Sequence, residues 1–362
     1  MGRAAGSRAM AKRVRVRLVS FVASATLFAG APAAGADGWR VPARALPLPR
    51  AASEALRRTL AAGAPPDVAA ARRGAPATDA EWRKEAASRA GERAARTRAL
   101  AARLRVSIES DRVAGVPVWW LRPAKVAPAQ SGHLFVHLHG GAYVFNGGLG
   151  GAVEGVLIAA RARIPVLSID YRMAPAHPCP AAIEDVVAVY RRLLRDRRAP
   201  SIALGGTSAG GGLTLAATLE LKRLGVELPA ALFAGTPWAD LTKTGDTLFS
   251  NEGVDHVLVT YDGALAGAAR LYAAGRDLRD PLVSPLYGDL RGFPPTLLVT
   301  GTRDLLLSDT ARVHRKLRSA GVEAELDVYE GLSHADYVSA IDSPESREVF
   351  AELGAFLARH LR

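Results

Sequence analysis

The segment Ser201–Gly225, SIALGGTSAGGGLTLAATLELKRLG, combines an expected strand, a tight turn and an expected helix. It starts with a short apolar run, SIALG, and its last fifteen residues have the pattern of an apolar helix. Between them, GTSAG places Ser208 at the turn, with a glycine two residues before it and two after. Such a turn pushes the serine hydroxyl out of the sheet, and the start of the helix favours negative charge beside it. The segment therefore predicts a nucleophilic serine at the carboxyl end of a buried strand.

The rest of the chain predicts the sheet to which this strand belongs. From residue 105 onward, longer helical patterns follow short apolar runs, which are VPVWWL, HLFVHL, PVLSI, SIALG, AALFAG, PTLLVT and AELDVY. Continuous apolar strands followed by helices are typical of a mostly parallel sheet covered on both faces. The helices are expected near residues 150–162, 181–198, 209–224, 255–274, 309–320 and 345–361. A first strand at 105–109 should run antiparallel to 116–121, across a turn at Gly115, which makes eight strands in one α/β domain over 105–362.

Two further segments precede that domain. Residues 37–104 are rich in Ala, Arg and Pro and predict an N-terminal helical segment. Its first helix spans 47–63 with Ser53 as a cap candidate, and its second spans 78–104 with Thr78 or Asp79 as the cap and Glu81 in the first turn. Residues 64–78 between them contain Pro and Gly and predict a loop.

Residues 1–36 have the three parts of a secretory signal peptide. A basic run, KRVRVR, precedes the 13 apolar residues LVSFVASATLFAG, and Ala34-Gly35-Ala36 offers a cleavage site before Asp37. The apolar run is too short to span a bilayer, which needs about 20 residues. A buried core helix rarely follows such a basic run. We therefore expect export to the periplasm or the medium, with no stable membrane span.

Charge and cysteine content exclude other classes. Residues 1–36 hold six of the 47 basic residues and none of the 35 acidic ones, so the remainder carries 41 against 35, a net charge of +6. These charges are scattered along mixed-sign helices, which indicates solvated faces and no nucleic-acid partner. The single cysteine, Cys179, cannot form an intrachain disulfide and belongs to no Cys/His motif. We expect neither a metal nor a cofactor, and the oligomeric state stays open.

The other strand ends carry the partners that a nucleophilic serine needs. After HLFVHL comes His139-Gly140-Gly141-Ala142-Tyr143, where the amides of Gly140 and Gly141 could bind an oxyanion together with that of Ala209. Taken alone, this could equally be a glycine turn. After PTLLVT comes Gly301-Thr302-Arg303-Asp304, whose carboxylate could orient a histidine.

The base is expected to be His334, which ends the loop EGLSH after the last strand. His256, His314 and His360 also follow Ser208, but they fall on helical patterns. Asp309 is expected to cap the helix DTARVHRKL, and Asp240 in TPWADL is the alternative orienting acid. Ser208, Asp304 and His334 follow one another in the order found in α/β hydrolases.

These motifs resemble the bacterial hormone-sensitive-lipase family of esterases. HGGAY is similar to the family's HGGG-type motif, and GTSAGG to the Thr-containing form of its nucleophile motif. DYRMAPAHPCPAAIEDV, residues 170–186, is similar to its DYRLAPEHPFPAALEDV segment. The resemblance runs from about Leu46 to the C-terminus and implies an α/β-hydrolase fold, an N-terminal helical cap and a Ser208–His334–Asp304 triad. Ala142 departs from the usual third glycine, Thr207 from the commoner Asp, and Ala176 from the commoner Glu.

We therefore expect a serine carboxylesterase that acts on short-chain acyl esters of small molecules through an acyl-enzyme. The same triad could open lactones or remove acetyl groups from amides, and these alternatives differ only in the shape of the pocket. A serine peptidase is less expected, because the chain has no large accessory domain for selecting peptides. The alternative outside catalysis is a binding protein on a hydrolase fold, against which the intact Ser, Asp, His and glycine motifs argue.

Overall fold

The computed structural model describes residues 41–362, together with Gly2 and Gly38. The chain divides into two units, residues 1–45 and 46–362, and every helix and strand of the described part belongs to the second unit. The expected signal peptide, residues 1–36, lies outside the described residues apart from Gly2. Within residues 41–362, no helix combines the length and the apolar character that crossing a bilayer would require.

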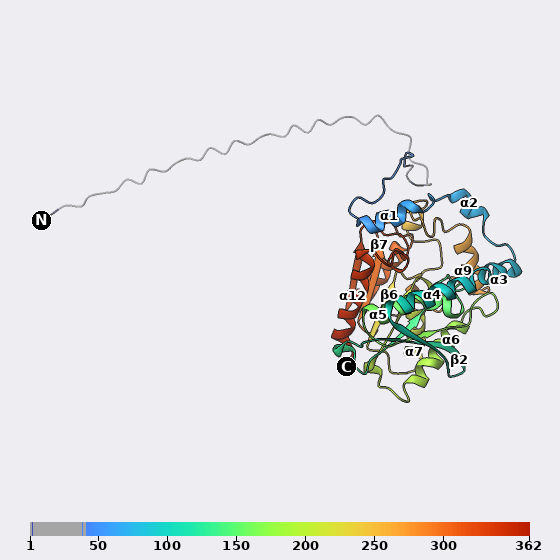
Figure 1. Ribbon diagram of the computed structural model, residues 1–362. Coiled ribbons are helices and arrows are strands. Elements are labelled where there is room, and N and C mark those ends of the chain that lie inside the picture. The colour runs from blue at the N-terminus through green and yellow to red at the C-terminus, as the bar shows by residue number, and fades with distance from the viewer. Residues whose placement is uncertain (1, 3–37, 39–40) are drawn as a thin grey trace. The chain divides into compact units, whose positions relative to one another are not determined.

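The predicted sheet is present with all eight strands (Figure 1). Its order is β1-β2-β4-β3-β5-β6-β7-β8, with the bounds β1 Val106–Val113, β2 Val116–Pro123, β3 Leu134–Leu138, β4 Val166–Ile169, β5 Ile202–Thr207, β6 Ala231–Gly235, β7 Thr296–Gly301 and β8 Ala324–Tyr329. Strands β3 to β8 are parallel, whereas β2 is antiparallel to both β1 and β4. The turn between β1 and β2 contains Gly115 at a φ of 82°, a conformation that glycine adopts freely. The prediction of a mostly parallel sheet with one antiparallel pair at its start is confirmed.

Helices cover both faces of the sheet, because the central strands are apolar on both sides. Every residue of β3, β5, β6 and β7 is buried. One face packs against α5 (Val153–Arg161) and α12 (Pro344–His360), and the other against α6 (Ala181–Leu193), α7 (Ala209–Arg223) and α10 (Leu307–Ser319). Successive residues of a strand point to opposite faces. Phe135 accordingly packs in the core on the side of α5 and α12, and its neighbours Leu134 and Val136 pack in the core on the side of α6, α7 and α10.

Four helices precede the sheet, and their bounds refine the prediction. They are α1 Glu54–Ala62, α2 Val68–Arg73, α3 Asp79–Ser88 and α4 Ala90–Leu104. Ser53 caps α1, and Thr78 with Glu81 forms a capping box on α3, as their positions predicted. The expected single helix over 78–104 is interrupted at Arg89, and the expected loop contains α2, which Asp67 caps by accepting the amide of Ala70 at 2.9 Å.

These N-terminal helices pack where glycines leave room. In α3, Trp82 lies over Gly267 of α9 (Ala264–Ala273), where a Cβ would come within 2.6 Å of the indole. In Figure 1, α3 and α9 lie side by side. Helix α4 packs against the 3-10 helix η2 (Gly148–Ala152), because a Cβ on Gly150 would lie 2.8 Å from the Cβ of Arg93. The contact places α4 near the carboxyl ends of the strands, where Ser208 lies.

The prediction of a helix over 255–274 is wrong for the first half of that segment, because α9 begins only at Ala264. The Asp255 carboxylate accepts the amides of Val257 at 2.8 Å and Leu258 at 3.1 Å, which holds a turn instead of a helix. Gly263 then adopts a φ of 129°, outside the helical region. The remaining short elements are α8 Thr247–Ser250, α11 Asp336–Ser339, η1 Pro128–Gln130, η3 Ala199–Ser201 and η4 Pro285–Tyr287.

Candidate active site

Ser208 lies in the sharp turn between β5 and α7. Its φ of 64° and ψ of −124° place a non-glycine residue in a strained conformation, which its amide helps to hold by donating to the carbonyl of Gly235 at 2.9 Å. The flanking glycines leave room for this turn. A Cβ on Gly206 would come within 1.8 Å of the carbonyl oxygen of Leu138, and a Cβ on Gly210 within 1.9 Å of the same atom. The strand, turn and helix predicted from GTSAG are therefore all present.

His334 and Asp304 form a buried pair beside this turn. His334 follows β8 and Asp304 follows β7, and Nδ1 of the histidine lies 3.1 Å from Oδ1 of the aspartate. The exposed fractions are 4% for His334 and 0% for Asp304. Three further donors hold the carboxylate of Asp304 in place, namely the Thr300 hydroxyl at 3.0 Å, the Leu306 amide at 2.8 Å and the Thr236 hydroxyl. The structure thus brings together the acid and the base predicted from the sequence.

The surroundings of His334 favour its charged form. Burial by itself lowers the pKa of His334, but the charge and hydrogen bond of Asp304, with smaller effects of Asp255 and Asp336, raise that pKa above its ordinary 6.5. Asp255 is a second buried carboxyl group, and it accepts the backbone amides of His334 at 3.3 Å and Leu305 at 2.8 Å. Burial first, and then the charge of Asp304, raise the pKa of Asp255.

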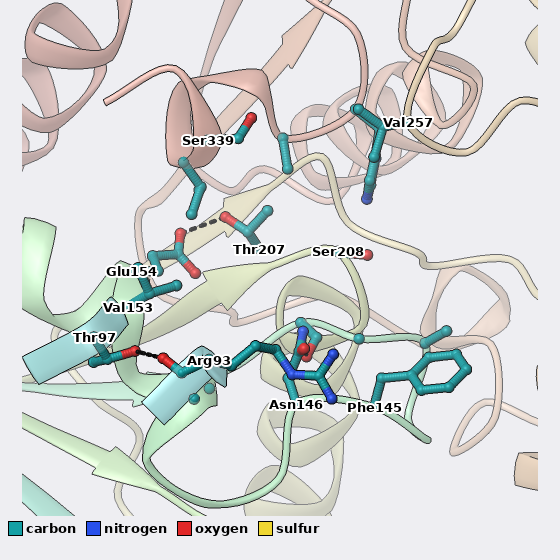
Figure 2. A pocket seen from close by; sticks show the side chains of 18 of the residues that line it. Arg93, Thr97, Phe145, Asn146, Val153, Glu154, Thr207, Ser208, Val257 and Ser339 are labelled. Carbon is teal, nitrogen blue, oxygen red and sulfur yellow. Dashed lines mark hydrogen bonds between the residues drawn. The ribbon is translucent and has the colours of Figure 1, made fainter. Parts of the chain in front are cut away.

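Ser208 and His334 line the same cavity, which has a volume of about 830 Å³. Figure 2 shows Ser208 among the residues that line it. Gly140 and Gly141 line it as well. A Cβ on Gly140 would come within 2.9 Å of the Thr207 carbonyl, and Gly141 has a φ of 120°. Among the described residues, the amides of Gly140, Gly141 and Ala209 have no hydrogen-bond acceptor. These three amides could therefore bind an oxyanion formed next to Ser208.

His139 and Tyr171 make contacts that hold the start of the glycine loop in place. Their rings stack with centroids 4.1 Å apart, and the Tyr171 hydroxyl donates to the carbonyl of His139 at 2.6 Å. Burial lowers the pKa of His139 to about 4, so this histidine is neutral near pH 7. Ala142 follows the two glycines with a φ of 54°, so alanine adopts the left-handed conformation at this position. Ala142, which departs from the family motif, therefore still allows the chain to turn at this position.

A buried polar network beneath the serine was missed by sequence reasoning. The Thr207 hydroxyl donates to the Glu154 carboxylate and lies 2.6 Å from the Tyr337 hydroxyl. The other oxygen of Glu154 lies 3.1 Å from Nε2 of His137, whose Nδ1 lies 2.9 Å from the Ser168 hydroxyl. Thr207, the residue that departs from the commoner Asp, therefore connects the serine turn to α5.

The two other aspartates considered from the sequence have structural contacts elsewhere. Asp240 pairs with Arg312 at 2.7 Å and accepts the Tyr287 hydroxyl at 3.0 Å, and within residues 41–362 its carboxylate makes no hydrogen bond to a histidine. Asp309 is not the cap of α10, which begins two residues earlier at Leu307. The Asp309 carboxylate instead accepts the amides of Ala239 at 3.1 Å and Asp240 at 2.9 Å, which ties α10 to the loop after β6.

His256 was placed on a helix from the sequence, but it lies in the turn that Asp255 holds. Its Nε2 lies 2.8 Å from Asp336 and its amide 3.3 Å from the Ser333 hydroxyl, so it supports the loop that carries His334. His314 and His360 do lie in helices, α10 and α12. Sequence reasoning did not identify Asp255 or Thr236 as site residues. Thr236 could have been found from its position directly after β6, whereas Asp255 has no such signal.

One group of described residues has metal-ligand spacing. Glu323, Glu325 and His360 place three ligand atoms within 4.8 Å of one another, at the start of β8 and the end of α12. None of the three lines the cavity, and Glu325 already pairs with Arg359 at 2.6 Å.

Comparisons with known proteins show the family to which the chain belongs. The family described as the alpha/beta hydrolase fold matches residues 135–338. An acetyl-hydrolase of Streptomyces hygroscopicus is 36% identical over 239 residues, which are 66% of this chain and 78% of that protein. An esterase of Acinetobacter venetianus is 33% identical over 253 residues, which are 69% of this chain and 82% of that protein.

Solved structures extend the likeness over nearly the whole described chain. The crystal structure of an esterase named E25 is 50% identical in sequence, with a TM-score of 0.88, and covers 90% of this chain and 99% of its own. An esterase from the bacterial hormone-sensitive lipase family is 32% identical, with a TM-score of 0.70, over 86% of this chain and 100% of its own.

Proposed function

Because the chain belongs to the α/β-hydrolase family, among esterases similar to bacterial hormone-sensitive lipase, we propose that it hydrolyses small short-chain esters through an acyl-enzyme on Ser208. The protein is a serine ester hydrolase. The covalent intermediate, the residue roles and the preferred acyl length make up the proposal.

The observation that carries it is the pairing of Asp304 with Nδ1 of His334 at the wall of the cavity that Ser208 also lines. With Nδ1 bound to Asp304, Nε2 is the ring nitrogen left to take the Ser208 proton. The serine oxygen then attacks the ester carbonyl, the alcohol leaves with the proton from His334, and the acyl group stays on Ser208. Water, deprotonated by His334, then attacks the acyl-enzyme and releases the acid.

The glycine loop supplies the electrostatic part of this proposal. Each tetrahedral intermediate has a negative oxygen, which needs donors that are already in place. The amides of Gly140, Gly141 and Ala209 are free to donate, and the tight backbone around Gly140 and Gly141 holds two of them fixed. Removing one such donor typically slows turnover by about 10²–10³.

The proposed preference for short acyl chains rests on the packing of α4 at the cavity wall. Side chains from α4, from the turn at 257–258 and from α9 line the cavity together with the glycine loop. At about 830 Å³ it lies in the range typical of sites for small molecules. Longer chains would have to displace α4, which packs closely against Gly150.

A screen of acyl length tests the proposal. kcat/KM should be measured for p-nitrophenyl esters from acetate to palmitate. An open tunnel would add about 0.8 kcal/mol of binding for each buried methylene, so rates would climb with length. A cavity whose wall is fixed by α4 should instead give a maximum at a short chain and a fall beyond it. A maximum at decanoate or longer would contradict the short-chain proposal.

Deacetylation is the second candidate, favoured by the likeness to the Streptomyces acetyl-hydrolase. The same serine and histidine could cleave an acetyl amide if the pocket holds the amine as leaving group. Comparing acetate release from an aryl acetate and from its acetanilide counterpart separates ester hydrolysis from deacetylation. A lactone substrate tests lactone opening, the other activity that the same triad could perform. A binding protein without catalysis would hydrolyse none of them.

A further inference from the structure

Two cationic side chains of α4, Arg93 and Arg96, are among the described residues that line the cavity, and Arg96 is already paired with Glu92. Arg93 lies near the start of α4, is half-buried and lines the cavity with Ser208 and His334. Figure 2 shows its guanidinium pointing away from the helix into the cavity, which Phe145 and Asn146 also line. The helix is fixed at this position, because Gly150 packs against the Cβ of Arg93.

The charge of Arg93 has no acidic partner among residues 41–362. A guanidinium carries five N–H donors, and the recorded bond of Arg93 runs from Nη2 to the Ala86 carbonyl at 2.8 Å. Two other arginines of the same helix differ in this respect, since Arg96 pairs with Glu92 and Arg103 with Asp342. Arg93 therefore retains donors and a full positive charge at the cavity wall.

The cavity does not neutralise this charge from its other walls. Among its described lining residues, Glu154 is the only carboxylate. One oxygen of Glu154 accepts from Thr207 and the other lies against His137, so both are already occupied within the network under the serine. A ligand that brings its own carboxylate would complete the hydrogen bonding of Arg93.

We propose that the substrates of this enzyme include esters that carry a carboxylate, which Arg93 binds while Ser208 attacks the ester carbonyl. The inference rests on the proposed ester hydrolysis at the same cavity. Arg suits the task because its planar fork can bind both oxygens of a carboxylate in parallel. The carboxylate can belong to the acyl part or to the alcohol part of the ester, since both must fit around Ser208.

Two matched substrate pairs test the proposal and separate these sources. Mono-p-nitrophenyl adipate and its methyl ester differ by one charge on the acyl side. 4-Acetoxyphenylacetic acid and its methyl ester differ in the same way on the alcohol side. The readout is kcat/KM for release of the phenol, as the ratio of charged to neutral substrate within each pair.

Arg93→Gln should lower this ratio about tenfold in at least one pair, because only the charged member of a pair loses an ion pair with Arg93. Arg93→Lys should retain part of the ratio. Arg98→Gln is the control, because it removes the same charge from α4 at an exposed residue that does not line the cavity. An equal effect of Arg93→Gln on charged and neutral members of both pairs would overturn the proposal, leaving Arg93 only its bond to Ala86.

The wild-type enzyme gives an independent readout if Arg93→Gln fails to fold. Raising the ionic strength should lower the charged-to-neutral ratio, since salt screens a partly exposed ion pair. A ratio that does not change with salt would then contradict the proposal. Failure to hydrolyse any neutral ester would instead count against the proposed esterase function itself.

Discussion

Three carboxyl groups from different parts of the chain surround His334. Asp304 binds its Nδ1, Asp255 accepts its backbone amide, and Asp336 lies two residues further along the chain. Their combined effect raises the pKa of His334 even though burial alone would lower it. A general base must be neutral to accept a proton, so this pKa sets the acid side of the activity profile.

The profile gives the first prediction at the scale of single residues. kcat/KM of the wild type should fall as the pH drops through a value above 6.5, since His334 then becomes protonated. Asp255→Asn removes one of the charges that raise the pKa of His334, so the fall should move to lower pH. The control is Asp246→Asn, an exposed carboxylate immediately before α8 whose side chain makes no capping hydrogen bond. An unchanged position of the fall in Asp255→Asn, or a move to higher pH, would contradict this account.

The sequence was most informative where single residues sit at strand ends. Ser208, Asp304 and His334 each follow an apolar run, and the structure places them as that position predicted. Asp255 and Glu154 could not be identified in this way, because they lie in a turn and on a helix. Their importance depends on contacts across about 50 residues, such as Asp255 with Leu305 and Glu154 with Thr207, which no local pattern contains.

At the scale of elements, two of the three expected caps mark helix starts, whereas Asp309 lies inside α10 and periodicity overestimated the length of α9. Ser53 and Thr78 mark α1 and α3 correctly, whereas the apolar pattern over 255–274 predicted a helix twice as long as α9. In that segment the Asp255 side chain competes with the helix by binding the amides of Val257 and Leu258. The same side-chain chemistry at Asp67 starts α2 in a segment predicted as a loop.

The contact between α10 and the loop after β6 gives a prediction about stability. Burial, and next the charge of Asp240, raise the pKa of Asp309 to about 8, from about 3.8 in an unfolded chain. A group whose pKa is raised by folding stabilises the fold most below its unfolded pKa and loses that contribution as the pH rises through its folded pKa. The contribution of Asp309 should therefore decline between about pH 4 and pH 8.

Asp309→Asn should flatten this decline, because an amide accepts the Ala239 and Asp240 amides without ionising. The melting temperature should be measured from pH 5 to pH 8.5 for both proteins. The melting temperature of the variant should rise relative to that of the wild type as the pH increases. Equal pH dependence in the two proteins would show that Asp309 does not titrate in this range. Asp246→Asn is again the matched control.

At the scale of the whole molecule, the N-terminal helices take part in the site although they precede the hydrolase sheet. Helix α4 supplies Arg93, Thr97 and Leu100 to the cavity wall, and Trp82 of α3 packs on Gly267 of α9, a helix that also lines the cavity. A cap over residues 37–104 was expected only from the family resemblance. Which of its residues face the serine could not be predicted, because this depends on glycines 150 and 267, over 50 residues away.

Export is a prediction for the molecule as a whole, and we propose it from residues 1–36 alone. The basic run, the apolar run of 13 residues and the small residues before Asp37 make up its evidence. Protein isolated from its own host should begin near Asp37 when its N-terminus is sequenced. An intact N-terminus on a cytoplasmic protein would contradict export without affecting the esterase site.

The central claim is that Ser208 is a nucleophile activated by His334 and Asp304, and fluorophosphonate labelling followed by intact-mass measurement tests it most directly. The wild type should gain the mass of one phosphonyl group, mapped to Ser208 by peptide analysis. Ser208→Ala should stay unlabelled and keep less than about a hundredth of the wild-type rate, because loss of a nucleophile costs orders of magnitude. Labelling at another residue, or an active Ser208→Ala protein, would contradict the account.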